Sequence, residues 1–395
     1  MNVLVLTPRY NTYVKDSVES LSKHVNHIDV FIHHNYFSEI SPYLPRFNKL
    51  EDIKKFQKKN LINNTNKPKN VDLHLTSFFY LIPDGININL GKRIFKYTDK
   101  IIKKENIKFD LIHAHFIWNT GYAGVKLKEK YKKPLIITGH GFDIKNVPFR
   151  NKKYYEKTIF TIEKSDHIIT VSKKYFEILN EKLGIDRNKI SVIPNGINID
   201  KFKGMNKNKV RTILNLPKDK KIILNIGNLL PVKGQKILIK SMKNMVSKRD
   251  DLLCLIIGEG YLKKELQKMI NRYNLQSDIK MLGGKHHSEI PYWMNSCDIY
   301  VQPSIHESFG VVLIESLACG KPVVASKVGG IPEIINSQKY GYLCDVGDTN
   351  DFTNRILQSI NKEYDVKIIR KHALNFSLEN NSKKLLKIYN YLDTN

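Results

Sequence analysis

The chain has 395 residues, 41% of them hydrophobic and 10% aromatic, which is enough apolar material for two ordinary domains. No run approaches the ~20 apolar residues of a membrane span. The first apolar run, residues 3–6, lacks the basic flank of a signal peptide and is expected to be a strand. The composition excludes a membrane-spanning protein and predicts a cytoplasmic one. Peripheral association with the inner face of the membrane is compatible with this prediction.

The formal net charge is +27, from 65 basic and 38 acidic residues. Three explanations stay open: biased codon usage, since Lys, Asn and Ile are abundant along the whole chain; attraction to an anionic membrane; and nucleic-acid binding. No RNA-binding aromatic motif or recognition-helix pattern supports the last, so we expect no nucleic-acid partner. The four cysteines form no C-x-x-C pair and are predicted to be buried free thiols of a reducing compartment.

Short apolar runs alternate with helical patterns, which is typical of parallel α/β sheets. In the first half we expect strands at 2–7, 28–33, 71–76, 109–114, 134–138, 166–171 and 190–193. Helices are expected between them at 16–25, 91–105, 119–131, 151–164 and 172–183. The segment 38–70 breaks the alternation and carries eight basic against three acidic residues. We interpret it as a mobile solvated excursion, with an acceptor-side or membrane-facing loop as the alternative.

Pro194-Asn195-Gly196 closes the first block, and the polar stretch 201–209 is expected to be a linker. In the second half we expect strands at 221–226, 252–257, 278–282, 298–302 and 322–325. Helices are expected at 235–247, 260–273, 288–295, 309–318, 331–336, 348–360 and 378–392. Ligands of open parallel sheets bind beyond the carboxyl ends of the strands. Glycine-rich or polar stretches follow such ends at 139–143, 227–234, 258–260, 303–310 and 326–333.

Two carboxylates, Glu307 and Glu315, bracket an apolar run that opens with Ser308-Phe309-Gly310. This opening is typical of a helix start, whose free N–H groups favour an anion such as phosphate. At ~100° per residue, both acids return to roughly the same side. The pattern suits a nucleotide-sugar, with phosphate on the backbone and hydroxyls on the carboxylates. The alternative is a capped helix with one solvated Glu and one in a salt bridge.

Residues 307–315 match the E-x7-E motif of the retaining glycosyltransferases of the GT-B fold called family 4. Residues 227–234 resemble the donor-diphosphate loop of that family. Residues 315–325 and 328–333 are close to the commonest sequence of the family at these places. Residues 109–115 and 192–196 fit its N-terminal half. The resemblance spans nearly the whole chain. The chain is most similar to a subgroup that builds cell-surface polysaccharides of the teichuronic-acid type, on the evidence of residues 227–234 and 286–290.

The resemblance implies an α/β protein with two Rossmann-like domains that face each other across a cleft. It places an acceptor-side domain at 1–198, a donor domain at 199–376, and a C-terminal helix at 377–395 that crosses back to the N-terminal domain. It implies a hexosyltransferase that uses a nucleotide-sugar as substrate, UDP-linked rather than GDP-linked, with no cofactor. The acceptor would be a glycan or a lipid-linked sugar, beside an anionic membrane surface.

Carried over residue by residue, the resemblance makes His140 and Glu307 catalytic candidates. Lys233 would bind the donor diphosphate, Glu315 the ribose hydroxyls, and Glu307 the transferred sugar. The donor-binding candidates are Gly227, Asn228, Lys233, Gly258, Glu307, Ser308, Phe309, Gly310, Val311 and Glu315. Arg9 and Asp143 are weaker acceptor-side candidates. His113 and His115, which follow a strand, are expected to be structural.

The sequence departs from the family pattern at two places. Asn228 stands where the family usually has arginine, so one diphosphate contact is missing or comes from elsewhere, such as Lys233 or Arg9. Thr7-Pro8-Arg9-Tyr10-Asn11 replaces the paired glycines that often follow the first strand. Close approach of that backbone to the sugar or diphosphate is therefore in question.

No Asp-x-Asp pair is placed after a strand to hold a metal, so we expect a metal-free transfer. The resemblance implies that the transfer retains the anomeric configuration. The leaving phosphate would help deprotonate the acceptor, and Glu307 as a covalent nucleophile ranks lower. Three alternatives stay open: a GT-B nucleotide-sugar epimerase, a non-catalytic sugar-nucleotide-binding scaffold, and a basic nucleic-acid-binding protein. The sequence of residues 307–333 argues against the epimerase.

Overall fold

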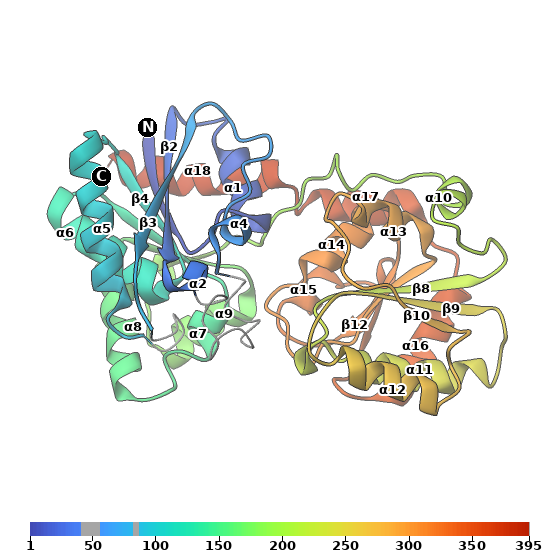
Figure 1. Ribbon diagram of the computed structural model, residues 1–395. Helices are drawn as coiled ribbons and strands as arrows, with labels where there is room; N and C mark the ends of the chain where they lie inside the picture. Colours follow the sequence, from blue (N-terminus) through green and yellow to red (C-terminus); the bar gives the residue numbers. More distant parts are fainter. Residues whose placement is uncertain (41–55, 82–86, 395) are drawn as a thin grey trace. The chain divides into compact units, whose positions relative to one another are not determined.

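The computed structural model describes residues 1–40, 56–81 and 87–394. They form two compact units (Figure 1), each described here by itself. The first unit comprises Met1–Gly196 and Leu378–Asn395, and the second comprises Ile197–Ser377. The chain thus leaves the first unit once and returns to it with the helix that ends the sequence.

The described part of the first unit contains a seven-stranded parallel sheet in the order β3-β2-β1-β4-β5-β6-β7. Its strands are β1 (Asn2–Thr7), β2 (His27–Asn35), β3 (Val71–Phe78), β4 (Leu111–His115), β5 (Leu135–Gly139), β6 (His167–Thr170) and β7 (Ile190–Val192). Its helices are α1 (Thr12–Leu21), α2 (Phe37–Ile40), α4 (Lys58–Leu61), α5 (Leu90–Glu105), η2 (Ile117–Gly121), α6 (Tyr122–Tyr131), α7 (Phe142–Lys145), α8 (Lys152–Lys164), α9 (Lys173–Glu177), η3 (Ile178–Lys182), η4 (Arg187–Lys189) and α18 (Leu378–Thr394).

Helix α18 is part of the core of the first unit. Leu385 and Tyr389 are buried in one apolar cluster with Val3 and Val5 of β1. Ser382 donates to Ser20 of α1 across 2.8 Å, which ties the two helices together. The sheet therefore has part of its apolar face covered by residues from the far end of the chain.

The second unit has a six-stranded parallel sheet in the order β10-β9-β8-β11-β12-β13. Its strands are β8 (Lys221–Ile226), β9 (Leu252–Ile257), β10 (Ile279–Met281), β11 (Ile299–Gln302), β12 (Val323–Ser326) and β13 (Gly341–Cys344). Its helices are α10 (Lys207–Ile213), η5 (Pro231–Lys233), α11 (Gln235–Val246), α12 (Lys263–Arg272), α13 (Ile290–Ser296), α14 (Val311–Ala318), α15 (Ile331–Ile334), α16 (Thr349–Ile360) and α17 (Val366–Leu374). Helices α11, α12 and α16 lie along one face of this sheet, and α13, α14 and α17 along the other (Figure 1).

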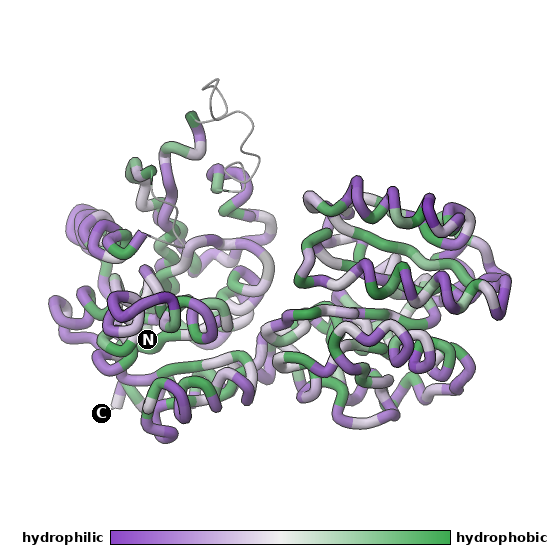
Figure 2. Tube along the Cα trace, turned by 90° about the horizontal axis from the view of Figure 1, so that it is seen from below, coloured by the Kyte–Doolittle hydropathy of each residue, from purple (hydrophilic) through white to green (hydrophobic). Residues whose placement is uncertain are grey.

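The local sequence explains these elements. Strand β9 is apolar at every position and buried throughout, as expected for a parallel strand covered on both faces. The helices alternate hydrophobic and hydrophilic residues along their turns (Figure 2), as one-sided packing requires. Asp348 caps α16 by accepting from the backbone N–H groups of Asn350 and Asp351.

The predicted α/β fold of two Rossmann-like blocks is confirmed, with several differences in the elements. Strand β13 and helix α17 were not predicted. The linker expected at 201–209 becomes helical from Lys207, and the helix expected at 309–318 begins at Val311. The helix expected at 119–131 starts as the irregular turn η2, and the one expected at 172–183 divides into α9 and η3.

The segment 38–70 differs from a mobile solvated excursion in the part that the structure describes. Leu61 is buried, and its carbonyl accepts from the N–H of Tyr10 at 2.8 Å. Tyr10 also forms a parallel bridge with Ile62. Residues 58–63 are therefore anchored beside the end of β1, while residues 41–55 lie outside the described residues.

All four cysteines are free and buried, as predicted. Among the residues that the structure describes, no helix combines the length and the apolar character needed to cross a bilayer.

Candidate active site

The candidate site in the second unit lies at the carboxyl edge of its sheet. Strands β8 and β11 are neighbours although they are not consecutive, so the strand order reverses between them. Ligands of open α/β sheets bind at such a reversal. The loops 227–234, 258–260, 303–310 and 327–330 follow β8, β9, β11 and β12.

Three glycines pack these four loops against one another. A Cβ on Gly234 would lie 1.8 Å from the carbonyl oxygen of Pro303, and one on Gly258 would lie 1.9 Å from that of Gly227. A Cβ on Gly329 would lie 1.8 Å from the carbonyl oxygen of Glu307. All three glycines also have positive φ, so no other residue fits without a shift of the backbone. At Gly227, by contrast, a Cβ would make only ordinary contacts within the protein.

Lys233 and Glu307 form an ion pair at this edge. The Lys233 ammonium donates to Glu307 Oε2 at 2.7 Å, and Gln302 Nε2 donates to the same oxygen at 2.8 Å. Tyr300 continues the network, because its hydroxyl lies 3.1 Å from Gln302 Oε1. Burial raises the pKa of Tyr300 well above its usual range, and the Glu307 and Glu315 carboxylates add to the effect. Both carboxylates thus act on one phenol.

Glu315 is buried on α14, and its Oε1 lies 3.2 Å from His287 Nε2. Neither Glu307 nor Glu315 is a solvated side chain, so the simpler alternative of one solvated and one paired acid does not describe this site.

Helix α14 begins without a side-chain cap. Gly310 is the N-cap in the left-handed region, and no acidic residue stands in the first turn. Phe309 is buried against Phe376 and anchors the turn, whereas Ser308 and Val311 are half-buried beside it. Such an uncapped N-terminus carries partial positive charge and unpaired donors, which suit an anion.

Asn228, at the position of the expected arginine, has an exposed side chain. Its backbone carbonyl accepts from Gln235 Nε2 at 3.1 Å. The loop is thus held through the backbone of Asn228.

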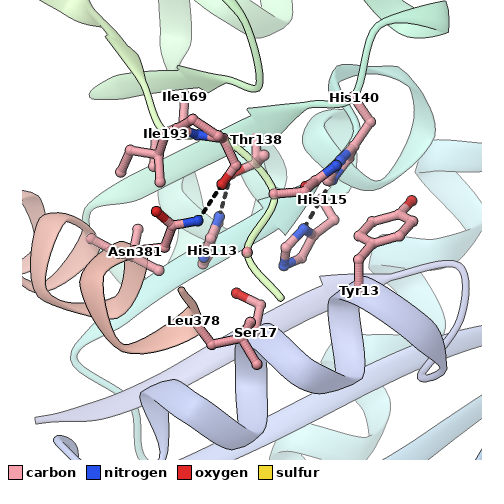
Figure 3. Close-up of a pocket in the computed structure, with 14 residues that line it drawn as sticks. Tyr13, Ser17, His113, His115, Thr138, His140, Ile169, Ile193, Leu378 and Asn381 are labelled. Carbon is pink, nitrogen blue, oxygen red and sulfur yellow. Dashed lines mark hydrogen bonds between the residues drawn. The ribbon is translucent and has the colours of Figure 1, made fainter. Parts of the chain in front are cut away.

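In the first unit, three histidines lie beside one small cavity of about 50 Å³ (Figure 3). His113 and His115 come from β4, and His140 follows β5. His115 Nδ1 lies 3.1 Å from His140 Nε2, and His113 Nδ1 lies 2.6 Å from the hydroxyl of Tyr389. His140 Nδ1 is buried and has no hydrogen-bond partner among the described residues. The predicted structural role of His113 fits its two buried partners, Tyr389 and Thr138.

Burial determines the charge of these rings. It lowers the pKa of His115 to about 4 and the pKa values of His113 and His140 well below 6.5. All three rings are therefore neutral at neutral pH. Two neutral imidazoles joined by one hydrogen bond must have one donor and one acceptor.

Asp143 and Arg9 lie at a second pocket of the first unit, of about 260 Å³, with aromatic walls that include Phe116, Trp118 and Phe142. Asp143 is buried and accepts from the backbone N–H groups of Ile117, His140 and Gly141. It therefore holds the loops after β4 and β5 together, as a cap does, although burial raises its pKa. Arg9 is exposed beside this pocket.

Within the described ranges, one group has metal-ligand geometry: His27, Asp29 and Asp72, whose ligand atoms lie within 4.8 Å of one another. These residues stand at the beginnings of β2 and β3, whereas His115 and His140 of the same unit lie at the carboxyl ends of β4 and β5. They also pair among themselves, with His27 Nε2 3.3 Å from Asp72 Oδ2.

Sequence reasoning missed Gln302, Tyr300 and His287 as members of the site. Gln302 ends a strand directly before the glutamate motif, and this position was a usable signal. His287 lies in the stretch 286–290 that contributed to the resemblance, but its contact with Glu315, 28 positions away, was not predicted.

Comparison with known proteins agrees with this geometry. The family model described as glycosyl transferases group 1 matches residues 206–376, and the one described as glycosyltransferase family 4 matches residues 64–201. An uncharacterized glycosyltransferase of Methanocaldococcus jannaschii is 35% identical over 284 residues, which cover 72% of this chain and 74% of that protein. The D-inositol 3-phosphate glycosyltransferase of Mycolicibacterium smegmatis is 25% identical over 321 residues, or 78% of this chain and 74% of that one.

Solved structures share the fold. HepE of Anabaena in complex with UDP has a TM-score of 0.75 at 20% identity, with 99% of this chain and 100% of that one covered. Sucrose-phosphate synthase of Thermosynechococcus elongatus has a TM-score of 0.78 at 20% identity, with 99% of each chain covered. The chain belongs to the group 1 glycosyltransferases, has their GT-B fold, and is an enzyme that transfers a sugar.

Proposed function

We propose that this protein transfers a sugar from a nucleotide-diphosphate donor, UDP-linked rather than GDP-linked, with retention of configuration and without a metal. The observation that carries the proposal is the Lys233–Glu307 pair beside the uncapped start of α14. A cation, a carboxylate and free backbone donors together suit a diphosphate joined to a hydroxyl-rich sugar. Solved relatives of the same fold bind UDP and UDP-glucose, which supports the choice of base.

In the proposed reaction, the bond from the anomeric carbon to the diphosphate oxygen breaks as the acceptor hydroxyl forms its bond on the same face. The acceptor proton passes to the departing phosphate oxygen. The Lys233 ammonium and the N-terminus of α14 stabilise the charge that develops on that phosphate, which is the task a metal performs in other transferases. Glu307 and His140 are the proposed catalytic residues, and Glu315 accepts from the ribose hydroxyls.

The proposed acceptor is a glycan or a lipid-linked sugar used in cell-surface polysaccharide or glycolipid synthesis. The enzyme would meet it at the cytoplasmic face of a membrane, where the net charge of +27 favours an anionic leaflet. Arg9 and the aromatic pocket beside Asp143 are the proposed acceptor-side elements.

Thermal unfolding with UDP-, GDP- and ADP-linked sugars and the free diphosphates tests the donor site. A ligand at 100 times its dissociation constant adds about 2.7 kcal/mol of stability, which is a shift of several degrees. We expect a shift with one base, lost in Glu315→Ala and kept in Glu265→Ala, which removes an exposed acid of the same unit that pairs with Lys236. A Glu315→Ala protein with an unchanged shift would remove the assignment of Glu315.

The anomeric configuration of the product, read by NMR, tests retention; an inverted product would contradict it. A protein that binds the diphosphate donor but turns over no glycan or lipid-linked acceptor would contradict the proposed acceptor class.

A further inference from the structure

A chain of hydrogen bonds in the second unit ends on the buried carboxylate of α14. Lys201 Nζ lies 2.6 Å from His287 Nδ1, and His287 Nε2 lies 3.2 Å from Glu315 Oε1. The backbone N–H of Lys201 is held by the side chain of Asn198, and the ring of His287 lies 5.7 Å from that of Phe202. Residues that follow the boundary at Gly196 thus reach the candidate donor site through one imidazole.

The chemistry of the partners fixes the tautomer of His287. A lysine ammonium carries only donors, so His287 Nδ1 must be the acceptor in the contact with Lys201. A neutral imidazole then carries its hydrogen on Nε2, and this N–H donates to Glu315 Oε1. Lys201 therefore determines which nitrogen of His287 faces Glu315.

We propose that His287 is a positioning residue for the donor nucleotide, which orients the Glu315 carboxylate to accept both hydroxyls of a ribose. The inference rests on the proposed function, in which Glu315 binds the ribose. One hydroxyl uses the second lone pair of Oε1, beside the N–H of His287, and the other uses Oε2. Among the described residues, none forms a hydrogen bond or an ion pair with Oε2.

The exposure of the pair indicates that its task is orientation and not stability. The His287 side chain is 44% exposed, whereas that of Glu315 is 9% exposed. Because His287 is nearly half exposed to water, its contact with Glu315 adds little to the stability of the protein. Orientation of the carboxylate plane, in contrast, decides whether a rigid vicinal diol can form two hydrogen bonds at once. The consequence is a preference for ribonucleotides over 2′-deoxyribonucleotides that depends on His287.

The experiment compares the dissociation constants of UDP and 2′-deoxy-UDP by titration calorimetry, with GDP and 2′-deoxy-GDP as the second pair of probes. The wild type should bind the ribonucleotide about tenfold more tightly, the value of one hydrogen bond to a charged group. His287→Phe keeps a ring and removes both nitrogens, so the ratio should fall to about one to two with little change in thermal stability.

Two matched variants make the result specific. His287→Gln should restore the ratio, because its amide can donate to Glu315 and accept from Lys201. His286→Phe makes the same change one position away, where the imidazole forms hydrogen bonds with Ser288 and not with Glu315, and it should behave as the wild type.

A wild-type ratio in His287→Phe would overturn the proposal. Equal weakening of both nucleotides would also overturn it, since that result means a general loss of the site. If the wild type binds neither UDP nor GDP, the proposed function itself fails. That outcome differs from the one that contradicts only the role of His287, in which the wild type and His287→Phe prefer the ribonucleotide over the 2′-deoxyribonucleotide to the same degree.

Discussion

Burial of three histidines makes the first unit sensitive to acid at the scale of single residues. His113 and His115 are buried in β4, and His140 lies against them after β5. Burial holds the pKa of His115 at about 4, whereas an unfolded histidine titrates near 6.5. Between these values the unfolded chain binds more protons than the folded one. The stability that His115 contributes is therefore present above about pH 6.5 and is lost as the pH falls toward 4.

We expect the midpoint temperature of thermal unfolding to decrease as the pH is lowered from 7.5 to 5. The decrease should be smaller in His115→Asn. The loss from His115 alone has an upper bound of about 3 kcal/mol, reached near pH 4. The amide of Asn can replace Nδ1 as the partner of His140 but does not titrate. His286→Asn, at an exposed site, should keep the wild-type dependence. Equal pH dependence in His115→Asn and the wild type would contradict this account.

At the same scale, the sequence singled out individual residues of the candidate site but not the contacts between them. Glu307, Lys233 and Glu315 were predicted from motifs. Lys233 and Glu307 stand in the loops that follow β8 and β11, and Glu315 lies within α14. The pairing of Glu307 with Lys233 was not predicted, because 74 positions separate them and only the sheet brings β8 beside β11. The roles assigned to these residues stay predictions.

At the scale of elements, long apolar or periodic runs were predictable and short ones were not. Strand β9 and helix α11 carry strong patterns and were predicted close to their observed bounds. Strand β13 has four residues and opens with Gly341, whose positive φ is uncommon in a strand. Helix α17 did carry a signal, because Asp365 caps it through the N–H groups of Lys367 and Ile368.

The loops at the carboxyl edge of the second sheet act as one packed element, and Gly329 is the position to test. We expect Gly329→Ala to lower the thermal midpoint and to abolish stabilisation by nucleotide, since its Cβ would lie 1.8 Å from the Glu307 carbonyl and displace that loop. Gly347→Ala is the matched control. Its φ is also positive, but nothing lies within 4 Å of its Cβ, so it should cost only about 1 kcal/mol of strain.

Nucleotide binding should survive Gly347→Ala. If Gly329→Ala had the same small effect as Gly347→Ala, the packing of the Glu307 loop against Gly329 would not be needed for the site.

At the scale of the whole molecule, the net charge can be read directly from the sequence, but its cause cannot. The value of +27 does not distinguish compositional bias from a membrane partner. The two explanations differ in salt dependence, because attraction to an anionic surface is screened within about 8 Å at physiological ionic strength.

We expect the protein to co-float with vesicles of anionic phosphatidylglycerol at 0.15 M salt and to be released at 0.5 M salt. Vesicles of neutral phosphatidylcholine should not retain it. Each Lys or Arg near the surface adds roughly 1 kcal/mol, so a few such contacts suffice for detectable binding. If anionic vesicles did not retain the protein at 0.15 M salt, the proposed membrane-associated acceptor would lose its support.

The place of α18 in the first unit also sets an order of assembly during synthesis. Tyr389 is buried beside His113, and Leu385 packs in the cluster of β1, yet both residues leave the ribosome after the whole second unit. Domains generally fold in the order in which they are made. Here the unit that is started first is completed last, so the second unit can fold while the first still exposes the apolar surface that α18 will cover. The apolar surface of the first unit that α18 covers therefore stays exposed on the nascent chain until α18 has left the ribosome.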